Sequence, residues 1–239
     1  MGMADFHTHI IPGIDDGSRD LDETGQLLMQ ERQHGVTTVV ATPHFYAQKT
    51  SVSTFLERRE AAYEKTMDWI AGQEGMPKLL KAAEVYFFPG MGKASALPQL
   101  TIEGTNVLLL EMPFAQWTDS VYREVREIIE KQKLTVLLAH LERFFQYQKD
   151  KSILEEVLDL PVYVQINAGS LLEWGSRRLD GKIIKSGLPV VLGSDCHNMR
   201  HRKPNLEEGR AVIRKKWGEE VLAAMDRNAQ ALLSAGTAD

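Results

Sequence analysis

The chain has 239 residues, a formal net charge of −5 and one cysteine, Cys196. Its length fits one large α/β domain, which we expect to span residues 1–239. The mixed, slightly acidic charge argues against nucleic-acid binding, the lone cysteine excludes an internal disulfide, and no apolar run reaches the roughly 18 residues of a membrane span. The N-terminus lacks a signal-peptide pattern, so we expect a cytoplasmic protein. The sequence leaves the oligomeric state open.

The first half of the chain alternates short apolar runs with amphipathic segments. Runs of β-branched or consecutive apolar residues predict strands, and apolar residues that recur every three or four positions predict helices. Gly35 stands where the first helix needs a C-terminal cap, and Ser53 is the expected N-terminal cap of the second. In order, we expect a strand at 4–11, a helix at 21–34, a strand at 37–42, a helix at 54–71, and strands at 78–87 and 106–111.

The second half continues this alternation. Strands that alternate with helices predict parallel pairing with right-handed crossovers. An open sheet and a closed barrel both have this pattern. In order, we expect a helix at 119–131, a strand at 134–139, a helix at 152–159 capped by Ser152, a strand at 162–166, a helix at 179–186, a strand at 189–192, and helices at 206–216 and 219–233.

Histidine, aspartate or glutamate stands at or near the carboxyl end of six of the seven predicted strands. These ends converge on one rim of a parallel barrel, whereas an open sheet would spread them along a line. We therefore predict an α/β fold in which seven strands close into a TIM-like (β/α) barrel. The residues concerned are His7, His9, His44, Glu84, Glu111, His140, Asp195 and His197.

These residue types at these positions predict a metal centre. Residues two apart on a strand point to the same side, so His7 pairs with His9 and Asp195 with His197. Burying so many polar groups without ions would be very costly, and mixed imidazole and carboxylate donors suit zinc, manganese or iron. The carboxylates exceed the need of one divalent ion, and Glu84 could bridge two. Clustered ions of this kind catalyse phosphoryl transfer.

Further candidates surround the predicted rim. Asp15 and Asp16 are either turn residues or a further metal ligand and proton donor. Arg143, with its planar guanidinium, could bind a phosphoryl group, and Arg200 and Arg202 add positive charge nearby; ordinary surface positions are the alternative for all three. Aromatic residues after the candidate ligands could line a cleft for an aromatic substrate group or pack as loops: Phe45, Phe114 and Phe144.

Several motifs resemble a known superfamily. The segment 5–9, Asp-Phe-His-Thr-His, with 15–17, Asp-Asp-Gly, resembles the first motif of the polymerase and histidinol phosphatase (PHP) superfamily. More closely, 41–44, 140–143, 165–171 and 193–198 are similar to the bacterial manganese-dependent tyrosine-protein phosphatases. Those enzymes act on tyrosine autokinases of capsule and exopolysaccharide synthesis. The resemblance runs from about residue 5 to 233 in the same motif order.

This resemblance implies a distorted seven-stranded PHP barrel with three divalent ions, manganese first and iron or zinc as alternatives. It implies hydrolysis of phosphotyrosine in a protein, with a membrane-associated bacterial tyrosine kinase as the expected partner. Arg143 would bind the phosphate, and Asp16 would ligate an ion. For the reaction itself, we expect a metal ion or Asp16 to help the phenolate to leave. The implied ligand sets are His7, His9, Glu84 and Asp195 for one ion, Glu84, Glu111 and His140 for a second, and Asp16, His44 and His197 for the third.

Two other functions stay open on the sequence. One is a small-molecule phosphatase of the same superfamily, which turnover of histidinol phosphate against a phosphotyrosine peptide would distinguish. The other is an amidohydrolase, a family that also opens with His-x-His and closes with a strand-end aspartate. That family often carries a metal-bridging lysine, whereas this chain offers Glu84 and Glu111, which argues against it.

Overall fold

The computed structural model describes residues 2–236, and the strands in this range form two parallel sheets. Their order is β1-β2-β4 in the first sheet and β3-β5-β6-β7-β8-β9 in the second. The parallel α/β architecture predicted from the sequence is therefore confirmed. The strands are β1 Met3–Thr8, β2 Val36–Ala41, β3 His44–Phe45, β4 Lys78–Lys81, β5 Glu84–Tyr86, β6 Val107–Glu111, β7 Thr135–Leu138, β8 Tyr163–Asn167 and β9 Val190–Gly193.

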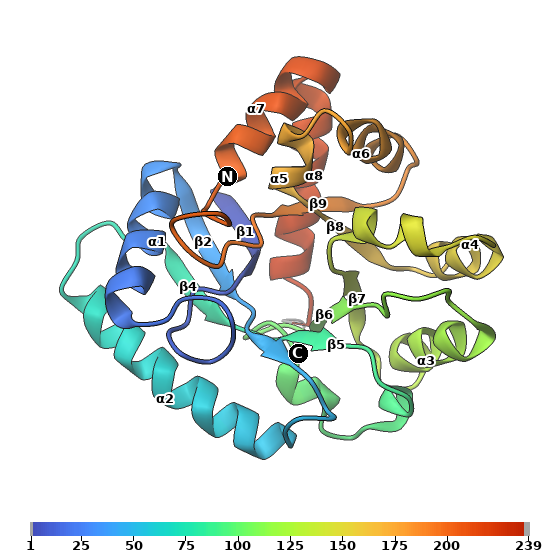
Figure 1. The fold of residues 1–239 in the computed structure, drawn as a ribbon, viewed down its shortest axis with the longest axis horizontal. Helices are drawn as coiled ribbons and strands as arrows, with labels where there is room; N and C mark the ends of the chain where they lie inside the picture. Colours follow the sequence, from blue (N-terminus) through green and yellow to red (C-terminus); the bar gives the residue numbers. More distant parts are fainter. Residues whose placement is uncertain (1, 237–239) are drawn as a thin grey trace.

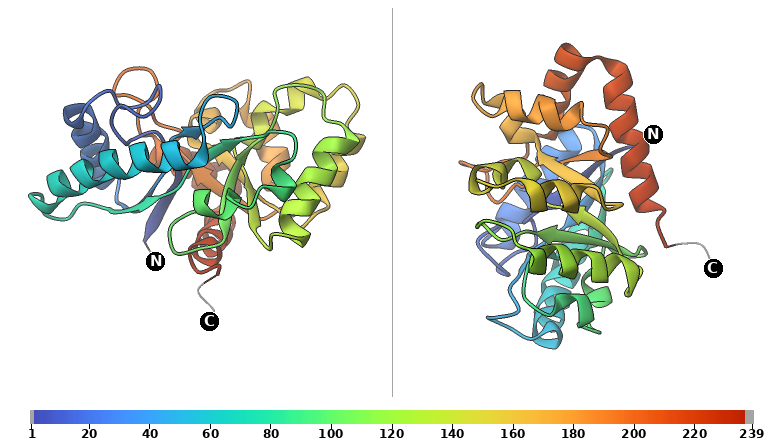
Figure 2. Two further views of the ribbon diagram at one scale, coloured as in Figure 1. Left: turned by 90° about the horizontal axis from the view of Figure 1, so that it is seen from below. Right: turned by 90° about the vertical axis from the view of Figure 1, so that its right-hand side faces the viewer.

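Helices connect the strands and lie around them (Figure 1). Figure 2 shows the last helix, in red, running along one side of the molecule. Within residues 2–236, no helix combines the length and the apolar character that crossing a membrane would need. The α-helices are α1 Leu21–Gln33, α2 Val52–Ala71, α3 Asp119–Glu130, α4 Ser152–Leu158, α5 Ala168–Leu172, α6 Arg177–Ile184, α7 Leu206–Trp217 and α8 Glu219–Leu233.

The structure does not confirm the closed barrel of seven strands, because the nine strands fall into two sheets. The strand predicted at 78–87 is interrupted by Ala82 and Ala83, which separate β4 from β5. The strand predicted at 37–42 ends with β2, and the short β3 follows after Thr42 and Pro43. Pro43 has no backbone N–H, so it cannot donate to a neighbouring strand. Between β1 and β9 the structure has an isolated bridge, from Thr8 to Cys196, instead of a continuous ladder.

Strand β1 contains an irregularity just before the histidines. Asp5 pairs with Val39 and Thr8 with Ala41, so three residue steps along β1 correspond to two along β2. One extra residue of this kind is a β-bulge, which bends a strand and turns its side chains. His7 lies within this irregular stretch of β1.

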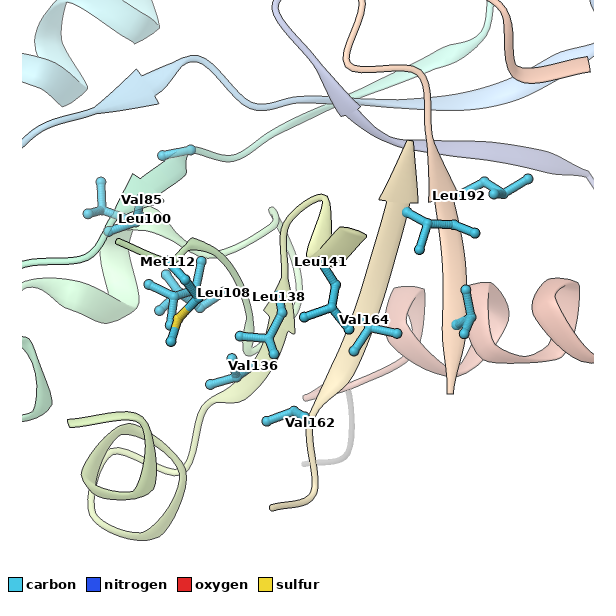
Figure 3. Close-up of a cluster of buried hydrophobic side chains, with 14 of the residues drawn as sticks. Val85, Leu100, Leu108, Met112, Val136, Leu138, Leu141, Val162, Val164 and Leu192 are labelled. Atoms are coloured by element: carbon cyan, nitrogen blue, oxygen red, sulfur yellow. The ribbon is translucent and has the colours of Figure 1, made fainter. Parts of the chain in front are cut away.

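Two apolar clusters hold the elements together. In the smaller one, Phe6, Val40 and Leu109 pack with Leu232, so that the strands meet α8. The larger cluster lies between the strands and the surrounding helices. Figure 3 shows the part of the larger cluster that includes β7, β8 and β9, where Val136, Leu138, Val164 and Leu192 are buried.

Some element boundaries differ from the predictions. Helix α2 begins at Val52, and Ser51, not Ser53, is its cap, accepting a hydrogen bond from the Thr54 N–H. Helix α4 begins at the expected residue, but Ser152 is its first residue and not its cap. The prediction that Gly35 ends the first helix is confirmed by its φ of +80°, which glycine adopts readily. Strand β3 and helix α5 had no prediction because each is too short to show a period.

Candidate metal centre

The nine candidate ligands come from strand ends and the loops that follow them, and they meet in one cluster. Donor atoms from these residues form four overlapping groups, and within each group the atoms lie within 4.8 Å of one another. Eight of the nine side chains lie largely inside the protein, and Asp16 is exposed. The groups are His9, Asp16, His44 and His197; His7, Glu84 and His140; His7, His9 and Asp195; and His44, Glu84 and Glu111.

Glu84 lies at the centre of the cluster. Its Oε2 is 3.2 Å from His7 Nε2, 3.3 Å from His9 Nε2 and 2.8 Å from His44 Nδ1. Its Oε1 is 2.8 Å from His140 Nε2. Burial alone would raise the pKa of Glu84, but the neighbouring imidazoles of His7, His140 and His44 hold that pKa well below its usual range. Glu84 is thus a carboxylate that faces donors of several ligand groups at once.

Gln165 and Asn167 at the end of β8 orient the ligands. Gln165 Oε1 accepts a hydrogen bond from the backbone N–H of His140 at 2.7 Å and lies 3.0 Å from His7 Nδ1. Because that oxygen is an acceptor, His7 Nδ1 carries the proton and Nε2 presents its lone pair to the cluster. Gln165 Nε2 donates to Asn167 Oδ1, and Asn167 Nδ2 donates to Asp195 Oδ2. Sequence analysis assigned neither residue to the site, although their spacing of two at a strand end was a signal.

The two neighbouring aspartates have different surroundings. Asp15 is buried, accepts hydrogen bonds from His9 Nδ1 at 2.7 Å and from the backbone N–H of His44, and so orients His9. Asp16 is 68% exposed and belongs to the first ligand group, with its Oδ1 3.5 Å from His44 Nε2 and 3.6 Å from His197 Nε2. The geometry therefore gives the pair two separate positions, one behind the ligands and one among them.

The histidines carry opposite pKa shifts. Burial lowers the pKa of His9, but hydrogen bonds to Asp15 and Glu84 outweigh it and raise the pKa to about 10. Burial also lowers the pKa of His140, and hydrogen bonds to Glu111 and Glu84 raise it to about 9. At His197, burial and the nearby charge of His9 act together and lower the pKa to about 3. The cluster therefore holds charges of both signs at close range.

The donor set fits divalent cations. Glu84 Oε2 is buried and makes no hydrogen bond to any described residue, although three imidazole nitrogens lie within 3.3 Å of it. A buried carboxylate oxygen surrounded by imidazole nitrogens in this way is positioned as a ligand of shared ions. Mixed imidazole and carboxylate sites of this kind suit manganese, iron and zinc.

Two of the three predicted arginines reach the cluster. Arg143 Nη2 lies 2.7 Å from Asp195 Oδ2, and Arg202 Nη2 lies 2.6 Å from Asp195 Oδ1. Arg202 Nη1 is also 2.9 Å from His197 Nε2. Arg200 is exposed and lines a separate cavity of about 250 Å³ beside Asp16.

The predicted aromatic contacts divide into buried and exposed residues. Phe45 is 1% exposed and Phe144 is 0% exposed, so both pack in the core and neither presents a ring to a substrate. Phe114 is 39% exposed and stacks on His140 with ring centroids 6.2 Å apart. Tyr147, which the sequence did not single out, packs against the edge of Phe114.

Comparisons with known proteins agree on one group of relatives. A family model described as "Capsular polysaccharide synthesis, CpsB/CapC" matches residues 3–234. Tyrosine-protein phosphatase YwqE of Bacillus subtilis is 27% identical over 97% of this chain and 91% of its own length. Tyrosine-protein phosphatase CpsB of Streptococcus pneumoniae is 26% identical over 90% of this chain and 91% of its own length.

Solved structures show the same fold. One structure, from a study of YwqE of Bacillus subtilis and CpsB of Streptococcus pneumoniae as metal-dependent tyrosine phosphatases, has a TM-score of 0.84 at 23% identity and covers 97% of this chain and 94% of its own. The phosphotriesterase homology protein of Escherichia coli has a TM-score of 0.52 at 13% identity, with 97% of each chain covered. These likenesses extend over nearly the whole described chain.

Proposed function

The chain belongs to the CpsB/CapC family of capsular polysaccharide synthesis, and from this premise we propose that it is a metal-dependent phosphatase that hydrolyses phosphotyrosine in proteins. The single observation that carries the proposal is the convergence of nine imidazole and carboxylate residues in overlapping groups within 4.8 Å. Several curated relatives along nearly the full length are named tyrosine-protein phosphatases. A phosphoric monoester is the substrate class that such a centre serves.

Three divalent ions are proposed for the cluster, with manganese as the first candidate and iron or zinc as alternatives. When bound, they would supply Lewis-acid charge to phosphoryl oxygens and lower the pKa of a coordinated water. The close approach of Glu84 to four histidines supports its role as a shared ligand. The proposed sets are those that the family resemblance implies, and the four donor groups contain the same nine residues in a different division. They are His7, His9, Glu84 and Asp195; Glu84, Glu111 and His140; and Asp16, His44 and His197.

Two guanidinium groups would hold the phosphate. Arg143 and Arg202 both contact Asp195, and each is partly exposed, at 39% and 37%. If a cation binds Asp195, the cation compensates the charge of that carboxylate. The guanidinium groups of Arg143 and Arg202 can then donate hydrogen bonds to the oxygens of a phosphoryl group. Charge that develops on those oxygens in the transition state would then meet two fixed positive groups.

The leaving group would depart past exposed residues of the rim. Phe114, stacked on His140 and partly exposed, offers a surface for the phenol ring. Asp16 is the exposed acid of the cluster and is our candidate to assist the departing phenolate, besides its place in the third ligand set. Arg200, in the adjoining cavity, adds positive charge for the substrate.

The seven-stranded description of the barrel belongs to this proposal as well. Strands β2 and β3 follow one another after two residues, as do β4 and β5, so each pair can be counted as one interrupted strand. The backbone N–H of Ala82 donates to Ala41 O, and that of Glu84 donates to Pro43 O, which keeps the two interrupted strands side by side. Counted in this way there are seven strands, and our proposal is that they surround one axis, with the isolated bridge from Thr8 to Cys196 where β1 meets the segment after β9.

The physiological substrate that we propose is a membrane-associated bacterial tyrosine kinase of capsule or exopolysaccharide synthesis. The family description supports a role in capsule synthesis, and the names of the relatives support a phosphotyrosine protein as the substrate class. A small-molecule phosphatase of the same fold would have the same centre. Comparing turnover of histidinol phosphate with that of a phosphotyrosine peptide separates the two.

The test combines metal analysis of the purified protein with a phosphotyrosine-peptide assay. We expect bound divalent metal and peptide hydrolysis in the wild type. His7→Ala should lose both metal and activity, whereas Arg143→Ala should keep the metal and raise the peptide KM or lower kcat by more than tenfold, since it removes a bidentate phosphate contact worth on the order of 2 kcal/mol. Full activity in His7→Ala would contradict the proposal.

A further inference from the structure

The connection between α5 and α6 carries an unusually exposed tryptophan. The side chain of Trp174 is 89% exposed, while every other exposed large hydrophobic side chain in residues 2–236 is at most 41% exposed. Leu172, two residues earlier, is 40% exposed and adds to the apolar surface. A tryptophan that gains nothing from the core of its own chain is typical of a contact point for another molecule.

Trp174 lies at the edge of the cavity that leads to the proposed phosphate site. Its neighbours in sequence, Glu173 and Gly175, both line a cavity of about 630 Å³. Arg143 and Asp195 line the same cavity. The same cavity therefore extends from the residues on either side of Trp174 to Arg143 and Asp195 at the metal centre.

The segment that carries Trp174 is held firmly at both ends. Arg177 Nε donates to Leu171 O at 2.6 Å, and its Nη2 donates to Leu172 O at 2.8 Å. Ser176 Oγ donates to Ser170 O at 2.5 Å. A segment fixed in this way presents the indole ring without a large entropy cost on binding.

We propose that Trp174 docks the substrate polypeptide on one side of the phosphotyrosine, by packing against an apolar or aromatic side chain of the phosphoprotein. The proposal rests on the proposed function and adds the chemistry by which the site would select a protein over a small phosphate ester. Trp174 is in this view a specificity-determining residue and takes no part in the chemical step.

The test compares a small aryl phosphate with phosphotyrosine peptides. The Mn²⁺-loaded wild type and Trp174→Ala are assayed with para-nitrophenyl phosphate and with two peptides that carry leucine or glycine on both sides of the phosphotyrosine. We expect Trp174→Ala to raise KM for the leucine peptide about tenfold, the loss typical of an aromatic contact residue. Its kcat for that peptide, and its kcat/KM for para-nitrophenyl phosphate, should stay within about twofold of the wild type.

Two controls sharpen the result. Trp174→Phe keeps an aromatic ring, so its KM for the leucine peptide should stay close to that of the wild type. Met67→Ala removes a 37% exposed side chain on α2 and should leave KM and kcat unchanged for all three substrates. Melting temperatures equal to that of the wild type would show that the variants are folded.

Other outcomes overturn the inference. Equal losses of kcat/KM with para-nitrophenyl phosphate and with the leucine peptide, or an unchanged peptide KM, would show that Trp174 does not contact the substrate polypeptide. Binding to phosphatidylglycerol vesicles that Trp174→Ala abolishes, with unchanged peptide kinetics, would assign the residue to a membrane surface instead. A wild type that hydrolyses neither substrate class would refute the proposed function, and the docking role with it.

Discussion

At the scale of single residues, two candidate ligands have backbone conformations that residues other than glycine rarely adopt. His140 has a φ of +28° and Asp195 a φ of +55°. Such conformations cost on the order of 1–3 kcal/mol and persist only where neighbours hold them. The backbone N–H of His140 donates to Gln165 Oε1, and that of Asp195 donates to His7 O at 2.7 Å. Forming the cluster therefore requires backbone strain at His140 and Asp195.

Gln165 is the residue that we expect to matter most among those that are not ligands. Gln165→Ala removes the acceptor for His140 N–H and for the Nδ1 proton of His7. We expect Mn²⁺ affinity, measured by equilibrium dialysis, to fall about 10- to 100-fold, as is typical when a partner of a metal-binding histidine is lost. Gln99→Ala, at an exposed position away from the site, should bind Mn²⁺ like the wild type. Equal affinity in both variants would contradict this role.

Asp180 should make stability depend on pH. It is fully buried, its Oδ2 accepts a hydrogen bond from Ser170 Oγ, and burial, with the charge of Glu142, raises its pKa from 3.8 to about 7. Between about pH 4 and 7 the unfolded chain therefore loses the Asp180 proton while the folded chain keeps it, so this residue lowers the free energy of unfolding as the pH rises.

The variant Asp180→Asn isolates this effect. We expect its free energy of unfolding, relative to the wild type, to rise on the order of 2 kcal/mol between pH 4 and pH 7, measured by urea denaturation. Asp159→Asn, at an exposed position, should show no such trend. If the free energies of unfolding of Asp180→Asn and the wild type differ by the same amount at pH 4 and pH 7, Asp180 does not keep its proton in the folded chain.

At the scale of elements, the sequence predicted what depends on local periodicity. Helices α1, α7 and α8 lie within about one residue of their predicted bounds, because apolar residues recur with a helical period over their length. The candidate ligands were found because strand ends are recognisable in the sequence. The spacing of Gln165 and Asn167 at a strand end was visible in the sequence, but their partners were not. Those partners, like the interruptions of the strands and the irregular register of β1, depend on contacts with segments far away in the chain.

The cap of α2 gives a direct test at this scale. Ser51 Oγ accepts a hydrogen bond from the Thr54 N–H at 3.2 Å, which satisfies one of the free N–H groups of the first turn. We expect Ser51→Ala to lower the free energy of unfolding by about 1 kcal/mol, the usual cost of losing a serine cap. Ser53 is the cap that the sequence predicted. Ser53→Ala should change the free energy of unfolding by less than about half as much as Ser51→Ala. The reverse order in urea denaturation would restore Ser53 as the cap.

At the scale of the whole molecule, the candidate metal centre joins the two ends of the chain. His7 comes from β1 and His197 from the loop after β9, and these parts meet because Gly193 allows a close approach. A Cβ at Gly193 would lie 2.6 Å from His7 Cβ and 2.9 Å from Gln165 Nε2, which is too close for any larger residue. The centre can form only once nearly the entire chain has folded around it.

Ions bound at such a place should stabilise the whole fold without being needed for it. The apolar clusters include residues from the strands and from α1 to α8, so they give the chain a core that does not depend on the ligands. We expect the chelated protein to keep its far-UV circular dichroism and to lose phosphatase activity. At an Mn²⁺ concentration about 100 times Kd, binding adds about 2.7 kcal/mol, or roughly 5–11 °C in Tm for a chain of this size.

The variant His7→Ala separates specific binding from a general effect of salt. It removes a ligand from two of the four donor groups, so its Tm should respond to Mn²⁺ by less than about half of the wild-type shift. Differential scanning calorimetry of both proteins with and without chelator measures the difference. Unfolding of the wild type on chelation would mean that the ions hold the fold itself, because the apolar clusters alone would then be insufficient to keep β1 and β9 together.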